Sequence, residues 1–336
     1  MFAPSLPLLV TLGDACGIGP EIVAKAFLQG ELHDAVVVGD AGVLRRALAA
    51  LGRPAPLALL QSPLDHAHCP PGCLPLLAGG GDAALAALPW GTIDPRAGAA
   101  AARWIEQAVR AVQQGQARAV VTAPIHKEAL SAAGVPYPGH TEMLQALAAG
   151  PDGSLPPVRM MLANPELKVV LVTIHVALRR ALELLDFDAV LSTVRIAHRA
   201  AAAWGQPAPR IAVAGLNPHA GEGGLFGDEE LRYIGPAVQA ARAEGIDAQG
   251  PFPPDTVFMR ARQGAFDLVV AMTHDHGLIP VKYLGVEEGV NVTLGLPFVR
   301  TSPDHGTAFD IAGRGLADAS SLVTAVRMAR QLSAGG

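Results

Sequence analysis

The chain has 336 residues, which is enough for two domains that each bury a core of their own. Half of the residues are hydrophobic and 16% are charged, a composition that suits a compact α/β enzyme and excludes a disordered chain. The formal net charge of −5 gives no reason to expect a nucleic acid as a partner.

Strand and helix patterns alternate along the chain. Apolar, β-branched runs predict buried parallel strands at residues 8–12, 35–38, 119–122, 168–173, 210–214 and 267–272. Helices are expected at residues 20–28, 42–51 and 94–113, with alanine-rich helices between the later strands. This repeated order predicts an α/β fold with a mostly parallel sheet and helices on both faces.

Loops, cysteines and the lack of a targeting signal add further expectations. The Pro-rich segment 69–77 and the triplet Gly79-Gly80-Gly81 predict surface loops. The segment His66-Ala-His68-Cys69-Pro-Pro-Gly-Cys73 offers metal ligands at short spacing, but no second cluster completes a structural zinc site, so we interpret it as a turn. Three cysteines are too few for a disulfide framework. With no secretory signal and no apolar run that could span a bilayer, we expect a cytoplasmic protein that contacts no membrane.

Three histidines follow the expected strands directly. They are His175, His219 and His274, and each comes just after an apolar run. Because open α/β sheets bind ligands at the carboxyl ends of their strands, these imidazoles could form a metal site with an open position. A single histidine there would ordinarily be a hydrogen-bonded turn residue, whereas three from separate strand ends favour a functional cluster.

The sequence also offers a glycine-rich turn and a polar loop. The turn Gly13-Asp14-Ala-Cys-Gly17-Ile-Gly19-Pro20-Glu21 permits close backbone approach to a ligand, or serves only as a tight strand–helix connection. No G-x-G-x-x-G motif occurs, so a dinucleotide would be held by another segment. Residues 304–315 are glycine-rich and polar, and this segment resembles the adenosine-binding loop of isocitrate and isopropylmalate dehydrogenases.

Several blocks in order carry a wider resemblance. They include Gly13-Asp14…Glu21, Thr122-Ala-Pro-Ile-His126-Lys127, Gly139-His140-Thr141-Glu142, Gly215-Leu-Asn217-Pro-His219, Pro254-Asp255-Thr256 and the stretch from His274-Asp275 to His305-Gly306-Thr307. Over nearly its whole length the chain resembles the 4-hydroxythreonine-4-phosphate dehydrogenase family of vitamin B6 biosynthesis.

The resemblance implies two α/β/α domains with a central cleft, as in isocitrate and isopropylmalate dehydrogenases. The first domain would consist of residues 1–128 plus 304–336 and carry the cofactor. The second, residues 129–303, would carry the metal, the substrate and the dimer contacts. The family forms a homodimer with a shared active site, so one metal-binding histidine would come from the partner subunit.

The resemblance also assigns roles to residues. Metal binding falls on His175, His219 and His274, with Zn, Mg or Co as the divalent ion and Asp255 as an additional ligand or a partner of the ligands. Substrate binding falls on His140, Thr141, Lys282, Asn291 and Arg300. Cofactor binding falls on His305, Gly306, Thr307 and Asp310. Lys282 and Arg300 would ordinarily be solvated surface charges, but they lie between apolar blocks near His274, and two cations suit a substrate with a phosphate and a carboxylate.

The implied reaction is a metal-dependent oxidation of the C3 hydroxyl of 4-phosphohydroxy-L-threonine by NAD or NADP. The β-keto acid formed would decarboxylate to 3-amino-2-oxopropyl phosphate. His274 and Lys282 are the candidate catalytic residues, with Lys282 or a metal-linked water as the base that accepts the hydroxyl proton. Asp310 and Asp318 make the cofactor loop acidic, which favours NAD over NADP.

Two departures from the family pattern leave the substrate open. Ala15-Cys16 replaces Pro-Ala, and His276 stands where the family usually has Gln, either as a harmless polar replacement or as an added titratable group. Relatives with this framework oxidise four-carbon sugar acid phosphates or carboxylated cis-dihydrodiols. The fold also resembles that of phosphate acyltransferases, and a non-catalytic metal or ligand sensor is a further alternative.

Overall fold

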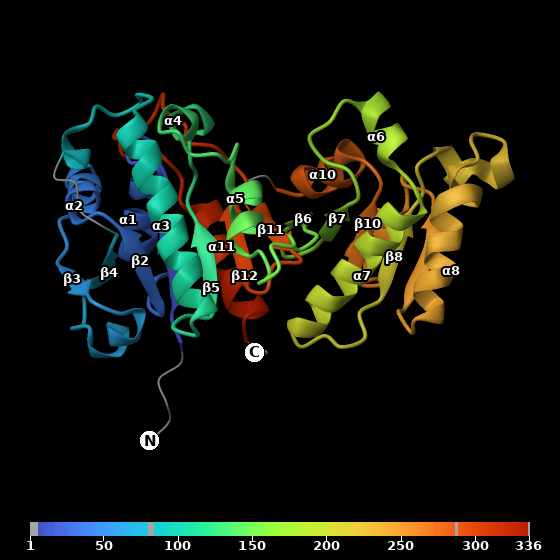
Figure 1. Cartoon of the computed structure of the whole chain (residues 1–336), viewed down its shortest axis with the longest axis horizontal. Helices are drawn as coiled ribbons and strands as arrows, with labels where there is room; N and C mark the ends of the chain where they lie inside the picture. The colour runs from blue at the N-terminus through green and yellow to red at the C-terminus, as the bar shows by residue number, and fades with distance from the viewer. Residues whose placement is uncertain (1–5, 80–83, 286–287, 335–336) are drawn as a thin grey trace, which may run out of the picture. The chain divides into compact units, whose positions relative to one another are not determined.

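The computed structural model describes residues 6–79, 84–285 and 288–334, and the chain divides into two compact units (Figure 1). The first unit comprises Met1–Pro156 and Leu296–Ser333, and the second comprises Pro157–Gly295 with Ala334–Gly336. Strands alternate with helices in both units, so the predicted α/β class is confirmed.

The strands of the first unit lie in the order β3-β4-β2-β1-β5-β12, and the pairings along this order are parallel. Their bounds are β1 Leu8–Thr11, β2 Ala35–Gly39, β3 Leu57–Leu60, β4 Leu74–Ala78, β5 Ala119–Thr122 and β12 Val299–Pro303. The helices are α1 Gly19–Leu28, α2 Ala41–Ala50, η1 Pro63–His68, η2 Leu85–Ala87, α3 Pro95–Gln113, α4 Lys127–Ala132, α5 His140–Leu147 and α11 Ser320–Leu332.

Local chemistry explains where the first unit's helices begin. The side chain of Asp40 accepts a hydrogen bond from the amide of Val43 and caps α2. Asp94 caps α3 in the same way, and Pro95 occupies the first helical turn, where its missing N–H costs nothing. Helix α3 packs against β1, β2 and β5, while α11 packs against β12 and β5. Helices α3 and α11 therefore cover the sheet of this unit and hold its strands in place.

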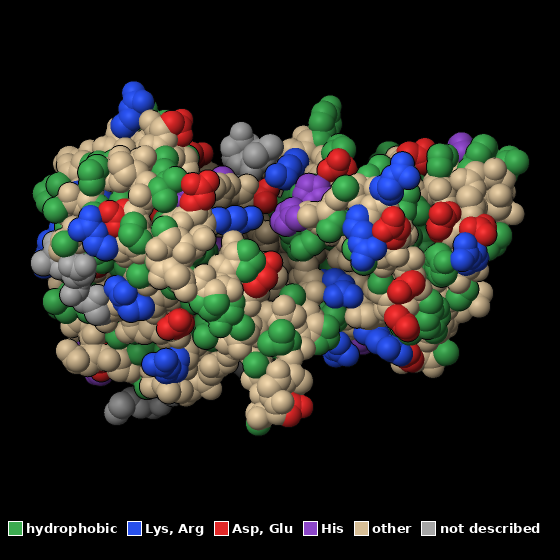
Figure 2. Space-filling view, turned by 45° about the horizontal axis from the view of Figure 1, so that its top comes forward, with side chains coloured by type: hydrophobic (Ala, Val, Ile, Leu, Met, Phe, Trp, Pro, Cys, Tyr) green, Lys and Arg blue, Asp and Glu red, His purple; other side chains and the backbone are tan. Residues whose placement is uncertain are grey.

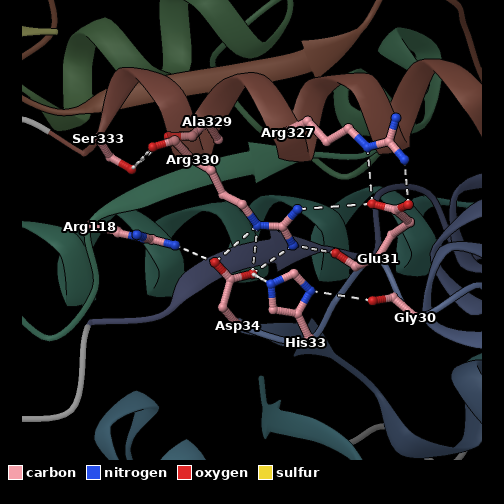
Figure 3. A network of polar contacts seen from close by, with 9 residues as sticks. All are labelled: Gly30, Glu31, His33, Asp34, Arg118, Arg327, Ala329, Arg330 and Ser333. Carbon is pink, nitrogen blue, oxygen red and sulfur yellow. Dashed lines mark hydrogen bonds and ion pairs between the residues drawn. The ribbon is translucent and has the colours of Figure 1, made fainter.

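A network of ion pairs joins α11, the last helix of the first unit, to the segment between α1 and β2 (Figure 3). From α11, Arg330 reaches Asp34 at 2.7 Å and Arg327 reaches Glu31 at 3.1 Å, while Arg118 also pairs with Asp34. Burial alone would raise the pKa of Asp34, but the guanidinium of Arg330 holds it below its usual range. The network fastens α11, and hence the strand β12 on which it packs, within this unit.

The strands of the second unit lie in the order β11-β6-β7-β10-β8-β9, antiparallel from β11 to β7 and parallel from β7 to β9. Their bounds are β6 Arg159–Ala163, β7 Lys168–Leu171, β8 Ile211–Ala214, β9 Ala248–Phe252, β10 Leu268–Ala271 and β11 Val290–Leu294. The helical segments are α6 Leu178–Leu184, α7 Phe187–Ala203, η3 Pro218–Gly224, η4 Glu230–Ile234, α8 Gly235–Ala243, α9 Val257–Arg262 and α10 His274–Tyr283.

The second unit is built around an apolar core that α9 and α10 cover. Val169 and Val269, from β7 and β10, are wholly buried in it. Val257 of α9 and Leu278 of α10 pack onto the same cluster. Burial of β-branched residues in the central strands leaves the polar residues that follow them at the carboxyl edge.

The structure confirms the predicted strands and helices to within about two residues at each end, which is the usual uncertainty of such boundaries. The loop predicted at residues 69–77 is wrong in part, because the run Leu-Pro-Leu-Leu pairs as β4 between β2 and β3. Of the glycine triplet, Gly80 and Gly81 lie outside the described residues. Strands β3, β6, β9, β11 and β12 were not predicted. Each is only four or five residues long, and of the five only β11 (Val-Asn-Val-Thr-Leu) alternates regularly between apolar and polar residues.

The boundaries between the units also differ from the expected domains. Residues 129–156 and 296–303 were expected in the second domain, but they belong to the first unit. Tertiary packing is the reason: Met143 and Leu144 of α5 pack on Ile105 of α3, and β12 pairs with β5. Neither contact has a local signal in the sequence.

Candidate functional site

The second unit presents its three candidate metal ligands at one edge of its sheet. Strands β7, β10 and β8 are parallel neighbours, so their carboxyl ends lie at the same edge. His175 follows β7, His274 follows β10 and His219 follows β8. The order of the strands along the sheet differs from their order along the chain, and it places His175 next to His274.

The imidazoles of His175 and His274 lie together. Their ring centroids are 5.5 Å apart and their planes meet at 49°. The Nδ1 of His274 is 2.7 Å from the Oδ1 of Asp275. In the tautomer in which Nδ1 donates to this carboxylate, the lone pair of Nε2 is available for a metal, an arrangement common among metal-binding histidines. Both rings line a pocket of about 300 Å³ that also contains Thr173 and Thr273, and Figure 2 shows histidine side chains gathered on the molecular surface.

His219 is not part of this pair. Its ring is tilted against Phe226 at a centroid distance of 5.9 Å, and it lines a neighbouring pocket of about 660 Å³ with Asp255. Asp275 and His276 line both pockets. Over the described residues, no three His, Cys, Asp or Glu side chains of the single chain are grouped closely enough to hold a metal ion. The predicted triad is therefore present as a pair plus one separate histidine.

The other candidates of the second unit lie on different elements. Lys282 is partly buried in the last turn of α10, and Asn291 is partly buried in β11, opposite Leu162 of β6. His276 is also partly buried, and its Nδ1 is enclosed without a hydrogen-bond partner. A buried, unpaired ring nitrogen is costly unless a ligand or an ordered water satisfies it.

The first unit brings Arg300 and His140 into electrostatic contact. Arg300 in β12 is 3% exposed and donates to the Oγ1 of Thr122 from Nε at 3.1 Å and from Nη2 at 2.6 Å. Burial lowers the pKa of Arg300 to about 9, so the guanidinium still carries its charge at neutral pH. Burial, and then the charge of Arg300, hold the pKa of His140 well below its usual range, which keeps the imidazole neutral. Its Nε2 is buried without a hydrogen-bond partner, and Thr141 follows it in the first turn of α5.

A buried guanidinium beside a neutral imidazole is suited to an anionic ligand. Arg300 supplies charge and a planar set of donors, while His140 can donate from one ring nitrogen without charge repulsion of its neighbour. The position of Arg300 on a strand also holds it in place, because β12 pairs with β5 and packs against α11.

The candidate cofactor loop follows β12 in the first unit. His305, Gly306 and Asp310 are exposed, whereas Thr307 is 8% exposed, and its carbonyl oxygen accepts from the amide of Ile18 at 3.0 Å. A side chain at Gly17 would approach the Cβ of Thr307 to 3.0 Å, so the glycine-rich turn is needed for this close packing. The loop offers exposed donors on a backbone that is fastened to the first helix.

Two polar residues of the first unit, the buried Asp14 and the partly buried His126, were given no role from the sequence. Asp14 is wholly buried; its Oδ1 accepts from the amide of Cys16 at 2.8 Å, and its Oδ2 has no partner. Burial raises the pKa of Asp14 to about 6. His126 stacks on Phe309 with a centroid distance of 4.6 Å, and its Nδ1 is also buried without a partner. Both lie in blocks that carry the family resemblance, but only the structure shows that each has a buried polar atom without a partner.

Comparison with known proteins assigns the chain to a family. Residues 31–329 match the family model described as pyridoxal phosphate biosynthetic protein PdxA. The chain belongs to the PdxA family. A 4-hydroxythreonine-4-phosphate dehydrogenase of Beijerinckia indica is 56% identical over 97% of this chain and 95% of the relative. A D-threonate 4-phosphate dehydrogenase of Pectobacterium atrosepticum is 46% identical over 97% of this chain and 99% of the relative.

A solved structure agrees with this assignment. The crystal structure of 4-hydroxythreonine-4-phosphate dehydrogenase from Klebsiella pneumoniae superposes with a TM-score of 0.91 at 44% identity, covering 99% of each chain. This PdxA family member is therefore an oxidoreductase of the dehydrogenase type, which argues against the acyltransferase alternative. Within the described residues, no helix is both long and apolar enough to cross a membrane.

Proposed function

We propose that the protein oxidises the C3 hydroxyl of 4-phosphohydroxy-L-threonine with NAD or NADP and a divalent metal ion. The resulting β-keto acid would lose its carboxylate to give 3-amino-2-oxopropyl phosphate. The observation that carries the proposal is the His175–His274 pair at adjacent strand ends, in a chain 56% identical to a protein named for this dehydrogenase activity. We place the reaction in the cytoplasm.

The residues of the second unit fit a divalent ion such as Zn, Mg or Co. His175 and His274 would bind it, with Asp275 holding the ring of His274 through Nδ1. When bound, a divalent ion supplies Lewis acidity, which lowers the pKa of an alcohol. Lys282 is the chain's candidate for the base that takes the hydroxyl proton, and Asn291 for a substrate hydrogen bond.

In the first unit, Arg300, His140 and Thr141 would bind the anionic groups of the substrate. Arg300 is charged, buried and already oriented by Thr122, so little side-chain entropy is lost when an anion binds. His305, Gly306, Thr307 and Asp310 would hold the dinucleotide, whose nicotinamide receives the hydrogen of the C3–H bond together with its electron pair.

A homodimer is part of the proposal. His219 lies apart from the His175–His274 pair, so a third imidazole for the metal would come from the partner subunit. The surface near His219 supports such a contact, because the side chains of Met259, Ile279 and Tyr283 in its pocket are 58%, 65% and 90% exposed. Large apolar groups exposed together are typical of protein interfaces.

D-Threonate 4-phosphate is the second candidate substrate, because a relative 46% identical is named for it. It shares a four-carbon chain and a phosphate with the first candidate but carries a hydroxyl in place of the amine. A carboxylated cis-dihydrodiol is a third candidate and lacks the phosphate. The buried charge of Arg300 favours the two phosphorylated acids.

The test is NADH formation, followed by its absorbance, with each of the three substrates before and after metal chelation. Turnover of phosphohydroxythreonine that vanishes with the chelator and returns with a divalent ion is the expected result. Faster turnover of D-threonate 4-phosphate would make that compound the substrate and would leave the proposed type of reaction unchanged. Turnover that persists in metal-free protein would contradict the role of the metal.

A further inference from the structure

The segment that carries His219 has an unusual backbone. Five consecutive residues, 219–223, have φ between 43° and 80°, which is the left-handed region. Three of them, His219, Ala220 and Glu222, are not glycine. L-residues avoid this conformation because Cβ approaches the following carbonyl oxygen, so a run of them persists only where the surrounding structure holds it.

A buried carboxylate holds the start of this turn. Glu230, the first residue of the π-helical turn η4, is 4% exposed. Its Oε1 accepts from the amides of Leu216 at 2.7 Å and Asn217 at 2.8 Å, and its Oε2 accepts from the Nδ2 of Asn217 at 2.9 Å. The carbonyl of Asn217 in turn accepts from the amide of Ala220 at 3.1 Å. The contacts run from Glu230 through Asn217 to the residue after His219.

Two glycines leave open the space that this carboxylate occupies. A Cβ at Gly215 would lie 2.9 Å from the Oε1 of Glu230, and one at Gly221 would lie 2.8 Å from its Oε2. Burial alone would raise the pKa of Glu230, but the hydrogen bonds from Asn217 hold it below its usual range. Glu230 is therefore an ionised group whose lone pairs are directed at the base of the turn.

We propose that Glu230 is a positioning residue for His219, and that its carboxylate holds the left-handed turn in the conformation that presents this imidazole to the metal. The inference rests on the proposed role of His219 as a ligand. Without the carboxylate, the amides of Leu216 and Asn217 lose their acceptor, and the residues after Asn217 relax toward right-handed conformations. His219 would then sample many orientations.

The test compares Glu230→Gln with Glu229→Gln in the full-length protein. Glu229 is partly buried and also accepts from the Nδ2 of Asn217, at 2.7 Å, but it touches no backbone amide of the turn, so it is the matched control. Two readouts are needed: Co²⁺ affinity from visible absorption, and amide hydrogen exchange of residues 216–226. Asn217→Ala is a second variant should Glu230→Gln fail to fold.

We expect Glu230→Gln to weaken Co²⁺ binding by about 10- to 100-fold, the usual effect of removing a group that orients a metal ligand, and to accelerate exchange in the turn. Asn217→Ala should do the same to a smaller extent, and Glu229→Gln should match the wild type. The variant His219→Ala distinguishes a failure of the proposed role of His219 as a ligand from a failure of the proposed role of Glu230. If His219→Ala weakens Co²⁺ binding but Glu230→Gln does not, the role of Glu230 is wrong. If His219→Ala binds Co²⁺ as the wild type does, His219 is not a ligand. The proposed role of His219 and the role of Glu230 that depends on it are then both wrong.

Discussion

The candidate residues of the two units differ in their exposure to solvent. In the first unit Arg300 is 3% exposed and paired with Thr122, and burial, together with the charge of Arg300, lowers the pKa of His140. In the second unit His175 and His219 are exposed, and His274 is partly so. The guanidinium of Arg300 is buried and oriented by protein contacts alone, whereas the solvent-facing imidazoles are held by the protein only in part, and a bound ion would complete their geometry. The first region is therefore expected to act through its own charge, and the second through a metal.

Replacement of a metal ligand should have the largest effect. We expect His274→Ala to lower kcat by about 1,000-fold or more, because Lewis-acid stabilisation is worth several kcal/mol, while NAD affinity stays unchanged. Steady-state kinetics, metal content and NAD titration check this together. The exposed His33 on the first unit supplies the control, since His33→Ala should leave all three values alone. If the His274→Ala protein were active without metal, the second region would not act through a metal.

Replacement of the buried arginine should come next. Lysine keeps the charge of Arg300 but not the planar donors that reach Thr122 and an anion, so Arg300→Lys should lower kcat/KM for a phosphorylated substrate by about 100-fold. Metal affinity should not change. A loss of metal affinity equal to that of His274→Ala would contradict the division of roles between the two regions.

The buried carboxyl of Asp14 should make stability depend on pH. Burial raises its pKa in the folded state to about 6, above the ordinary value of 3.8. The folded state therefore holds the proton more tightly, and stability falls as the pH rises from about 4 to 6, by about 3 kcal/mol, and is level above that range. Asp14→Asn should abolish this step. The free energy of unfolding of variant and wild type is measured at pH 4 and at pH 8. Relative to the wild type, the variant should be more stable at pH 8 than at pH 4. An unchanged difference would contradict the raised pKa of Asp14.

The smallest effect is expected for the carboxylate beside His274. Asp275→Asn should weaken metal binding by about 10- to 100-fold, because an amide oxygen is a poorer acceptor for the Nδ1 of His274 than a carboxylate. Competition with a chromophoric chelator measures this. Asp188 on α7 is exposed, and Asp188→Asn is the control for loss of one negative charge. Equal metal affinity in both variants would show that Asp275 does not orient the ligand.

The sequence by itself determined the α/β class and the ends of the buried parallel strands that carry the three histidines. A run such as Leu268-Val-Val-Ala271 forms a strand wherever both of its faces are covered, so the polar residue after it falls at the sheet edge. That is why His175, His219 and His274 could be singled out, and why the ordered motifs identified the family.

Only the tertiary structure decided which of these residues meet. The sheet order places β10 beside β7, so His274 lies against His175, and it places β12 beside β5, so Arg300 lies on Thr122. Asp14 and Glu230 gain their roles from burial, which depends on side chains distant in the chain. Strand order and burial arise from the packing of the whole unit, and no local pattern of residues encodes them.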